Sequence, residues 1–249
     1  MEVLGIIPAR FASTRFPGKA LADIGGKPMV QRVYEQANKV IATLFIATDN
    51  EKIEKTAQQF GGQCIMTSSA HQSGTDRCYE ALQTISSGLK KDFDIVVNIQ
   101  GDEPFVQTAQ IQALIDCFEK PEVEISTLVK KIDNPADIFN PNYPKVILDT
   151  QGRAIYFSRS PIPFIRNVPE QEWHTRHTFY KHLGMYAYRC SMLKKICSLP
   201  PSSLEKAEAL EQNRWIEHGM QIYTAETTTE SYPVDIPADI EKLKQLKLI

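Results

Sequence analysis

The chain has 249 residues, of which 42% are hydrophobic and 23% charged, an ordinary composition for a globular protein with a substantial core. Its 28 Lys and Arg residues are balanced by 30 Asp and Glu residues, and the formal net charge of -2 argues against a large nucleic-acid-binding face. No apolar run has the length of a membrane span, no signal peptide is visible, and the five cysteines fit no zinc or disulfide spacing. We therefore expect a cytoplasmic protein with free thiols that binds neither a membrane nor a nucleic acid.

The first informative stretch is a short apolar run, Leu4–Ile7, followed by a basic loop. The run predicts a buried strand that ends at Pro8, and the loop places Arg10, Arg15 and Lys19 within ten residues. Open α/β sheets hold nucleotides in such loops, and Arg and Lys side chains match the charge of phosphates. Neither G-x-G-x-x-G nor G-x-x-x-x-G-K-[ST] is present. The loop therefore predicts a different kind of phosphate site, with a solvent-exposed basic turn as the alternative.

Helical and strand patterns alternate after this loop, which predicts a parallel sheet with helical crossovers. The expected elements are a helix that starts at Pro28, a strand at Leu44–Ala47, a helix capped by Thr48–Asn50, and a strand at Cys64–Met66.

The polar stretch Thr67–Arg77 is rich in small residues and cannot belong to a core. Its amides and hydroxyls could read the edge of a nucleotide base. It could equally be a surface loop that caps a helix around Tyr79–Ile85. The sequence leaves both interpretations open.

A second informative stretch begins with Ile95–Ile99, whose β-branched residues predict a central strand. Gly101 follows, where the backbone can come close to a ligand. Asp102 then provides a carboxylate at the end of the strand. Magnesium takes hard oxygen ligands and bridges phosphates, so Asp102 is a candidate metal ligand. The alternative is that Asp102 caps the helix expected at Thr108–Phe118.

The second half of the chain departs from simple alternation and indicates an inserted region. We predict a single domain, 1–249, with an inserted β-rich subdomain at about 145–190 that builds the substrate side or a subunit contact. The expected elements are strands at Glu124–Lys131 and His182–Tyr188, a hairpin of Val146–Asp149 with Ala154–Phe157, an amphipathic helix at Glu205–Glu217, a strand at Ile222–Ala225, and a helix that starts at Pro237. Asp235 is either the cap of that last helix or a second metal carboxylate.

Taken together, five stretches resemble the motifs of sugar-acid cytidylyltransferases. They are Pro8-Ala9-Arg10-x-x-Ser13-x-Arg15-x-Pro17-Gly18-Lys19, His71-Gln72-Ser73-Gly74-Thr75-Asp76-Arg77, Asn98-Ile99-Gln100-Gly101-Asp102-Glu103-Pro104, Tyr156-Phe157-Ser158-Arg159 and His182-Leu183-Gly184-x-Tyr186. As a set, over residues 3–240, they resemble the 3-deoxy-manno-octulosonate cytidylyltransferases, also called CMP-Kdo synthetases. The segment Ile165–Thr178 matches no motif, and Tyr232–Ile236 is bulkier than the usual Gly-Val-Asp-Thr.

This resemblance implies a Rossmann-like α/β fold: a mixed, mostly parallel sheet with helices on both faces and an inserted β-rich region for dimerisation and substrate binding. It also implies a homodimer that uses CTP, Mg2+ and a 3-deoxy sugar acid in lipopolysaccharide biosynthesis. The implied reaction is attack of the sugar's anomeric hydroxyl on the α-phosphorus of CTP, with release of pyrophosphate.

The resemblance also implies roles for particular residues. Arg10, Ser13, Arg15 and Lys19 would hold the CTP phosphates; Ser73, Gly74 and Arg77 would belong to the cytidine pocket; Asp102 and Asp235 would be the magnesium carboxylates; and Gln100, Arg159, His182, Tyr186, Glu211 and Gln212 would surround the sugar acid. Lys19, Asp102 and Arg15 would act in catalysis.

Two rival functions stay open at this stage. The first is a cytidylyltransferase for another sugar acid, such as sialate, and the second is a nucleotide-binding protein without turnover. A dehydrogenase is disfavoured because the dinucleotide glycine fingerprint is missing. The cytidylyltransferase interpretation requires that Lys19, its neighbouring arginines and Asp102 meet across one cleft, with room between them for a bridging cation and three phosphates.

Overall fold

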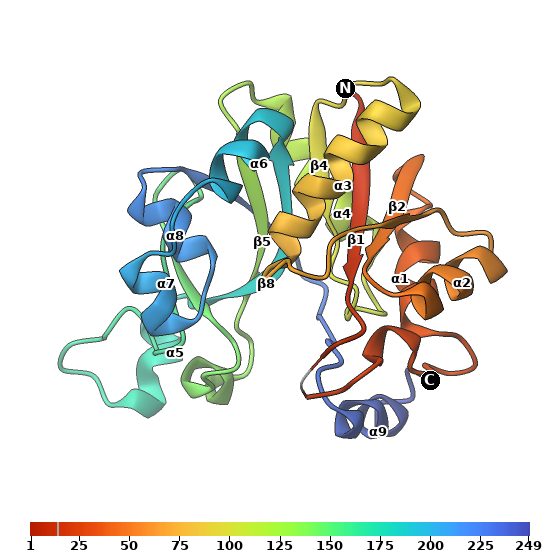
Figure 1. The fold of residues 1–249 in the computed structure, drawn as a ribbon. Coiled ribbons are helices and arrows are strands. Elements are labelled where there is room, and N and C mark those ends of the chain that lie inside the picture. Colours follow the sequence, from red (N-terminus) through yellow and green to blue (C-terminus); the bar gives the residue numbers. More distant parts are fainter. Residues whose placement is uncertain (14) are drawn as a thin grey trace. The chain divides into compact units, whose positions relative to one another are not determined.

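The computed structural model describes residues 1–13 and 15–249 and divides the chain into two compact units (Figure 1). Unit 1 comprises Met1–Gln112, Ala187–Cys197 and Ser231–Ile249, and unit 2 comprises Ala113–Tyr186 and Ser198–Glu230. The inserted subdomain expected at about 145–190 lies in unit 2 as far as Tyr186. Unit 2 is larger than expected because strands from before and after that stretch pair with it, as described below.

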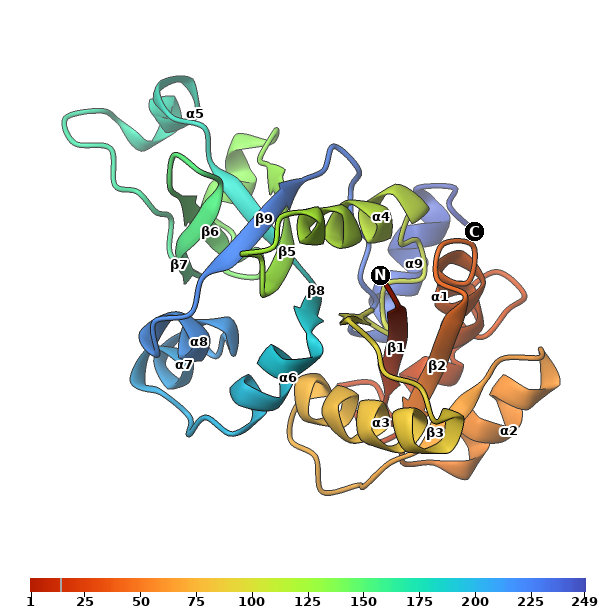
Figure 2. The ribbon, with the colours of Figure 1, turned by 90° about the horizontal axis from the view of Figure 1, so that it is seen from above.

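Unit 1 is built on strands that run parallel and are connected by helices. Its elements are β1 (Val3–Ala9), α1 (Met29–Ala37), β2 (Thr43–Thr48), α2 (Glu51–Gln59), β3 (Cys64–Met66), α3 (Gly74–Leu89), β4 (Ile95–Asn98), α6 (Cys190–Cys197) and α9 (Pro237–Gln245). The strands lie in the order β3, β2, β1, β4, and every pairing between them is parallel. Figure 2 shows α1 and α3 on opposite sides of β1 and β2. The predicted alternation of strands and helices is confirmed.

The first strand continues through Pro8, so the expectation that Pro8 ends it is wrong. Pro8 is in register with Ala47, and Ala9 with Thr48, on the neighbouring strand β2. The carbonyl of Ile6 accepts from the amide of Ile99, just beyond β4. Because the backbone groups of every second residue point to the same side of a strand, the nitrogen of Pro8 also faces the β4 side. The ladder with β4 ends at Ile6, and the missing N–H of Pro8 therefore costs no ladder hydrogen bond.

The backbone of β1 leaves no room for a side chain at Gly101. A Cβ atom at Gly101 would lie 2.8 Å from the carbonyl oxygen of Pro8. The absence of a side chain lets the segment after β4 pass directly beside the end of β1. This close approach fixes where the next residue, Asp102, leaves the sheet.

Unit 2 contains a ring of strands. Its elements are β5 (Ile125–Lys131), β6 (Lys145–Leu148), β7 (Arg153–Ser158), α5 (Trp173–Arg176), β8 (Tyr180–Arg189, as far as Tyr186), α7 (Ser203–Glu208), α8 (Gln212–Glu217) and β9 (Ile222–Glu226). Neighbouring strands follow the order β8, β5, β9, β7, β6, and a further pairing of β6 with β8 closes the ring. The pairing of β5 with β9 is parallel, whereas β6 with β7 is the antiparallel hairpin predicted from the sequence. The mixed α/β character of the prediction is thus confirmed.

The single helix predicted at Glu205–Glu217 is wrong, because two short helices occupy this stretch. Ala209 adopts a left-handed conformation with φ of 50°, which ends α7 and turns the chain before α8. Arg214 on α8 is ion-paired with Glu205 on α7, so the two helices are held together across the turn. The helix α6 was not predicted at all.

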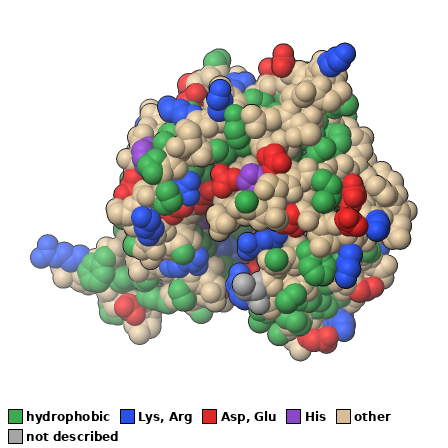
Figure 3. Space-filling view, in the orientation of Figure 1, with side chains coloured by type: hydrophobic (Ala, Val, Ile, Leu, Met, Phe, Trp, Pro, Cys, Tyr) green, Lys and Arg blue, Asp and Glu red, His purple; other side chains and the backbone are tan. Residues whose placement is uncertain are grey.

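The helices and surface bear on the expected class of protein. Among the helices of residues 1–13 and 15–249, none combines the length and apolar character that crossing a membrane would need. Acidic and basic side chains are interspersed over the face drawn in Figure 3, which presents no broad basic surface.

Replacement of Gly101 by Ala should reduce stability, because the new methyl group would meet a backbone oxygen that cannot move aside. We expect a loss of about 1–3 kcal/mol in the free energy of unfolding. Gly88 in α3 is the matched control, since a Cβ there meets nothing within 4 Å and Gly88→Ala should gain roughly 0.5–1 kcal/mol. Urea denaturation measures both, and equal stability of the two variants would show that the close approach is not restrictive.

Candidate active site

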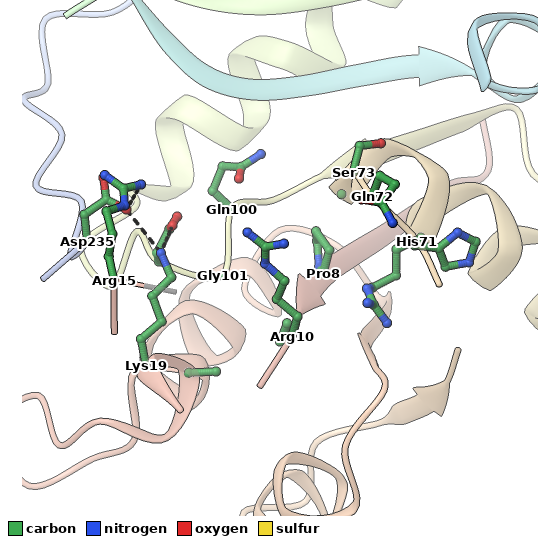
Figure 4. A pocket seen from close by; sticks show the side chains of 15 residues that line it. Pro8, Arg10, Arg15, Lys19, His71, Gln72, Ser73, Gln100, Gly101 and Asp235 are labelled. Carbon is green, nitrogen blue, oxygen red and sulfur yellow. Dashed lines mark hydrogen bonds and ion pairs between the residues drawn. The ribbon is translucent and has the colours of Figure 1, made fainter. Parts of the chain in front are cut away.

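A cavity of about 240 Å3 opens in unit 1 where β1 and β4 end and α3 begins (Figure 4). The residues that line it are Pro8, Ala9, Arg10, Arg15, Lys19, Ala20, His71, Gln72, Ser73, Gly74, Arg77, Gln100, Gly101, Asp102 and Asp235. The volume is near the lower end of small-ligand sites, which span about 300–1,000 Å3. The position, at the carboxyl ends of parallel strands, is where open α/β sheets bind ligands.

One end of the cavity holds a cluster of two acids and two bases. The Lys19 ammonium donates to Asp102 Oδ2 at 2.5 Å and to Asp235 Oδ1 at 3.3 Å. The Arg15 guanidinium donates to the same Asp235 oxygen at 3.1 Å. Lys19, its neighbouring arginines and Asp102 therefore meet in one cleft, as expected, but the room expected between Lys19 and Asp102 for a bridging cation is taken up by their direct ion pair.

Local structure explains how these side chains converge. Gly18 adopts a left-handed conformation with φ of 70° and starts the short 3-10 helix Lys19–Leu21, which directs Lys19 to the cavity. The Asp102 carbonyl accepts from the amide of Val234 at 2.9 Å, so Asp235 follows directly beside Asp102. Val234 is fully buried.

Neither Asp102 nor Asp235 caps a helix in the structure, so the alternative role predicted for each acid is wrong. The amides of Asp235 and Ile236 donate to Asp239 Oδ2 at 2.8 and 2.9 Å, so Asp239 serves the start of α9. The helix α4 (Thr108–Asp116) begins six residues beyond Asp102. Both carboxylates are thereby available to the cavity.

The bulk of the segment before Asp235 is accommodated by packing. The Tyr232 ring meets Phe105 edge-on with centroids 6.4 Å apart. Both rings pack against the buried cluster that contains Val234 and Met29. The departure from the usual small residues at this point therefore leaves Asp235 in the cavity.

The other end of the cavity is formed by the polar loop and the start of α3. Ser73 caps the helix by accepting from the amide of Asp76 at 3.1 Å, and it also lines the cavity. Both interpretations that the sequence left open are thus compatible, since one loop caps α3 and faces the cavity. In Figure 4, Arg10 and Gln100 lie between Ser73 on one side and Lys19 on the other.

Glu80 on α3 holds this polar loop in place from outside the cavity. Its Oε2 accepts from the amide of Ser68 at 2.9 Å and is hydrogen-bonded to His71 Nε2. Burial raises the pKa of Glu80, but these hydrogen bonds outweigh it and hold the pKa below its ordinary value. The carboxylate is therefore ionised at neutral pH.

Arg77, predicted for the cytidine pocket, is engaged by the protein itself. Its side chain is 4% exposed, and its guanidinium donates to Asp49 Oδ2 at 2.8 Å and to Thr67 Oγ1 at 2.6 Å. The other oxygen of Asp49 accepts from the amide of Phe11 at 3.5 Å. Asp49 thus ties the loop after β1 to α3.

Sequence reasoning missed Asp49, although a signal was present. Asp49 directly follows β2, and the ends of β1, β2 and β4 meet at one edge of the sheet. The stretch Thr48–Asn50 predicts a helix cap, a role that the Asn50 side chain performs by accepting from the amide of Lys52.

The two carboxylates of the cavity fit a magnesium ion. Oxygens of both carboxylates lie within hydrogen-bond reach of one ammonium, so both acids face the same part of the cavity. No group of three or more His, Cys, Asp or Glu side chains gathers to hold a metal among the described residues. Magnesium commonly binds one or two carboxylates together with substrate phosphates, so a pair of acids beside a phosphate site suffices.

Of the remaining predicted residues, most lie outside this cavity. Ser13 is buried in the loop after β1 and does not line the cavity. Of the residues predicted to surround the sugar acid, Gln100 lines the cavity of unit 1. The others belong to unit 2, and they are Arg159, His182, Tyr186, Glu211 and Gln212.

His182 and Tyr186 lie side by side in the interior of unit 2, with ring centroids 5.3 Å apart. The His182 Nε2 atom is hydrogen-bonded to Thr127 Oγ1 at 2.9 Å. Burial lowers the pKa of His182 to about 3 and raises that of Tyr186 well above its ordinary value. Both side chains are therefore neutral near pH 7.

Arg159 is held rigidly by its own unit. Its amide donates to Glu208 Oε2 at 2.9 Å, and its guanidinium donates to the carbonyls of Glu208 and Pro141 at 2.8 and 3.0 Å. The buried Lys145 ammonium donates to the Arg159 carbonyl at 2.7 Å. Burial and the charge of Arg159 lower the pKa of Lys145 to about 8.

The last two side chains differ in their surroundings. Glu211 lies 3.9 Å from the Arg214 guanidinium. Gln212 is buried, and its Nε2 group has no hydrogen-bond partner among residues 1–13 and 15–249. A buried donor of this kind marks a place where a ligand oxygen would be favourable.

Known proteins provide an independent comparison. The chain matches the Cytidylyltransferase family over residues 4–222. It is a member of that family. This cytidylyltransferase is 53% identical to the 3-deoxy-manno-octulosonate cytidylyltransferase of Parabacteroides distasonis, over 97% of the chain and 96% of that protein. It is 45% identical to the 8-amino-3,8-dideoxy-manno-octulosonate cytidylyltransferase of a Shewanella strain, over 98% of both chains.

Solved structures agree with the sequence relatives. The cytidylyltransferase superimposes with a TM-score of 0.90 on a CMP:2-keto-3-deoxy-manno-octonic acid synthetase complexed with CTP. The identity is 40%, over 100% of this chain and 99% of that one. The resemblance to 3-deoxy-manno-octulosonate cytidylyltransferases, drawn from the motifs, is confirmed.

Removal of the Asp49 carboxylate should destabilise this cytidylyltransferase strongly, because it leaves the buried Arg77 charge without its partner. We expect Asp49→Ala to cost about 3–5 kcal/mol in unfolding free energy. Glu51→Ala is the matched control, since its pair with Lys55 is 77% and 71% exposed and should contribute about 0–1 kcal/mol. Urea denaturation compares the two, and similar losses would refute a structural role for the buried pair.

Proposed function

We propose that this chain transfers the cytidylyl group of CTP to a 3-deoxy-manno-octulosonate-type sugar acid, forming the CMP-sugar and pyrophosphate. The observation that carries the proposal is the cavity of unit 1, where three cationic side chains meet two carboxylates at the ends of parallel strands. The relatives that carry this name are about half identical to the chain over nearly its whole length, which supports the same substrate class.

In the proposed reaction the anomeric hydroxyl oxygen of the sugar acid bonds to the α-phosphorus of CTP. The bond from that phosphorus to the bridging oxygen breaks, and pyrophosphate leaves. Charge develops on the phosphoryl oxygens, so catalysis depends mainly on positioning and electrostatic stabilisation. Arg10, Arg15 and Lys19 line the cavity and would neutralise the triphosphate.

Asp102 and Asp235 would hold Mg2+, which neutralises phosphate charge and lowers the pKa of the attacking hydroxyl when bound. His71 lines the cavity but is hydrogen-bonded to Glu80. No obvious general base therefore stands out among the described lining residues. The proposed sugar-acid contacts of Gln100 and of Arg159, His182, Tyr186, Glu211 and Gln212 stay predictions.

Pyrophosphate release tests the proposed function. Purified protein with CTP and Mg2+ should release pyrophosphate with 3-deoxy-manno-octulosonate or its 8-amino analogue, and much more slowly with sialate. A faster rate with sialate would assign a different sugar acid. CTP binding that needs magnesium, with no product from any acceptor, would favour a nucleotide-binding protein without turnover.

Replacement of Asp102 by Asn keeps the shape of the side chain but removes its charge. We expect kcat to fall by a factor of about 10^2–10^3, with little change in stability, because the lost charge acts on the transition state. Asp92→Asn is the matched control, since Asp92 is an exposed acid just before β4. Near-normal turnover of Asp102→Asn in the same pyrophosphate assay would contradict the metal role.

We further propose that the protein acts in the cytoplasm, in lipopolysaccharide biosynthesis, as a homodimer. Exposed apolar side chains on unit 2 support the subunit contact: Phe164 is 74% exposed and Ile155 52% exposed. Phe164 packs edge-on against Trp173, which belongs to the segment Ile165–Thr178 that matched no motif.

Sedimentation analysis tests the dimer. The wild type should have a molecular mass in solution twice that of one chain. Phe164→Ser should shift the monomer–dimer equilibrium toward the monomer. Leu89→Ser, at an exposed position of unit 1, is the matched control and should leave the dimer intact. A wild type that sediments as a single chain at micromolar concentration would refute the proposal.

A further inference from the structure

The two carboxylates that would bind magnesium already share a cation in this structure. The Lys19 ammonium donates to both, to Asp102 at 2.5 Å and to Asp235 at 3.3 Å. The Arg15 guanidinium adds a second positive charge on the Asp235 side, at 3.1 Å. Two acids and two bases therefore balance each other without any metal ion.

An ammonium and a divalent cation compete for this position. Magnesium needs carboxylate oxygens at about 2.0–2.1 Å, closer than the ammonium now lies. An ion at that distance from the same oxygens would stand next to the ammonium, and like charges at such range repel strongly. The carboxylate pair can hold Lys19 or a divalent cation in this position, but not both.

Lys19 is able to leave the carboxylates without a change of the fold. Its backbone is held at both ends, because its amide donates to the Phe16 carbonyl at 3.1 Å and its carbonyl accepts from the amide of Ala22 at 3.0 Å. Its side chain is 18% exposed and ends at the two carboxylates, with Arg10 to one side of it in Figure 4. A lysine ammonium is a point charge on a flexible four-carbon stem, so it can turn from one anion to another.

We propose that Lys19 is an exchangeable counter-ion of the Asp102–Asp235 pair. In the nucleotide-free protein it occupies the carboxylates and weakens the binding of divalent cations. A bound triphosphate gives the ammonium a second anionic partner, and the carboxylates then accept the metal. This inference rests on the proposed function, since it assigns the order in which that site fills.

The consequence is a coupling between metal and nucleotide binding. Because binding free energies are reciprocal, the nucleotide tightens metal binding by the same factor by which the metal tightens nucleotide binding. Lys19 then has two separate effects. It stabilises the leaving phosphates, and it keeps the carboxylates from binding metal before the nucleotide arrives.

Metal titration of the nucleotide-free protein tests the exchange. Mn2+ is the probe, because it prefers the same carboxylate ligands as Mg2+ and free Mn2+ is measured directly by electron paramagnetic resonance. Lys19→Met, which keeps most of the side-chain length and removes the charge, should bind Mn2+ about 10- to 100-fold more tightly than the wild type. Lys19→Gln should do the same, and serves if the Met variant does not fold.

Two controls separate exchange from a general electrostatic effect. Arg10→Met removes a positive charge that lines the same cavity. It should give a much smaller gain, because no ion pair joins Arg10 to either acid among the described residues. The double variant Lys19→Met with Asp102→Asn should lose the gain.

Three outcomes would overturn the inference. They are no gain in the Lys19 variants, an equal gain in Arg10→Met, and a gain that survives the loss of the Asp102 charge. The titration requires no turnover, so it is independent of the pyrophosphate assay. Suppose that the wild type makes product but the Lys19→Met variant does not bind Mn2+ more tightly. This result would refute the exchange and leave the proposed function intact.

Discussion

The site depends on the balance of charge between Lys19 and the two acids that it contacts. Two carboxylates held side by side repel each other, and only a cation between them makes the arrangement favourable. The polypeptide provides that cation from the first loop of the chain, and the acids from the ends of β4 and from the segment before α9. In the proposed reaction Lys19 binds phosphate and the two acids bind the metal ion. The charges that stabilise the site are therefore also the ones that the proposed chemistry uses.

The backbone around the cavity serves this meeting of charges. Gly101 lets the chain after β4 pass against Pro8, and the carbonyl of Asp102 then binds the amide of Val234. Asp49 fixes the loop after β1 to Arg77, and Glu80 fixes the loop before α3. The carboxylates of Asp49 and Glu80 therefore hold in place the loops that shape the site.

Much of unit 1 could be predicted from the sequence because its signals are local. The apolar run of β1, the β-branched run of β4 and the cap of α2 each lie within a few residues. Asp102 could be singled out because it follows a buried strand, at the edge where open α/β sheets hold nucleotides. The family motifs then identified the chemistry, which composition and periodicity alone would have left as a phosphate site.

The remaining features depend on contacts between distant parts of the chain. Asp235 is brought beside Asp102 by a backbone hydrogen bond of its neighbour Val234, which is 132 residues from Asp102. Nothing in the sequence around Asp235 itself distinguishes a metal ligand from a helix cap. The strand β9 completes unit 2 by pairing with β5 and β7, so the extent of that unit could not be read from the inserted stretch. The break between α7 and α8 occurs at Ala209, which has a left-handed backbone conformation. Glycine is the usual residue at such a position, so alanine gave no sign of the break in the sequence.

The most direct test of the account is a crystal structure of the protein grown with CTP and Mn2+, in which anomalous scattering locates the metal. The account predicts a metal ion bonded to the carboxylates of Asp102 and Asp235, with the triphosphate beside Arg10, Arg15 and Lys19. A metal bound away from both acids, or a nucleotide outside the cavity of unit 1, would contradict it.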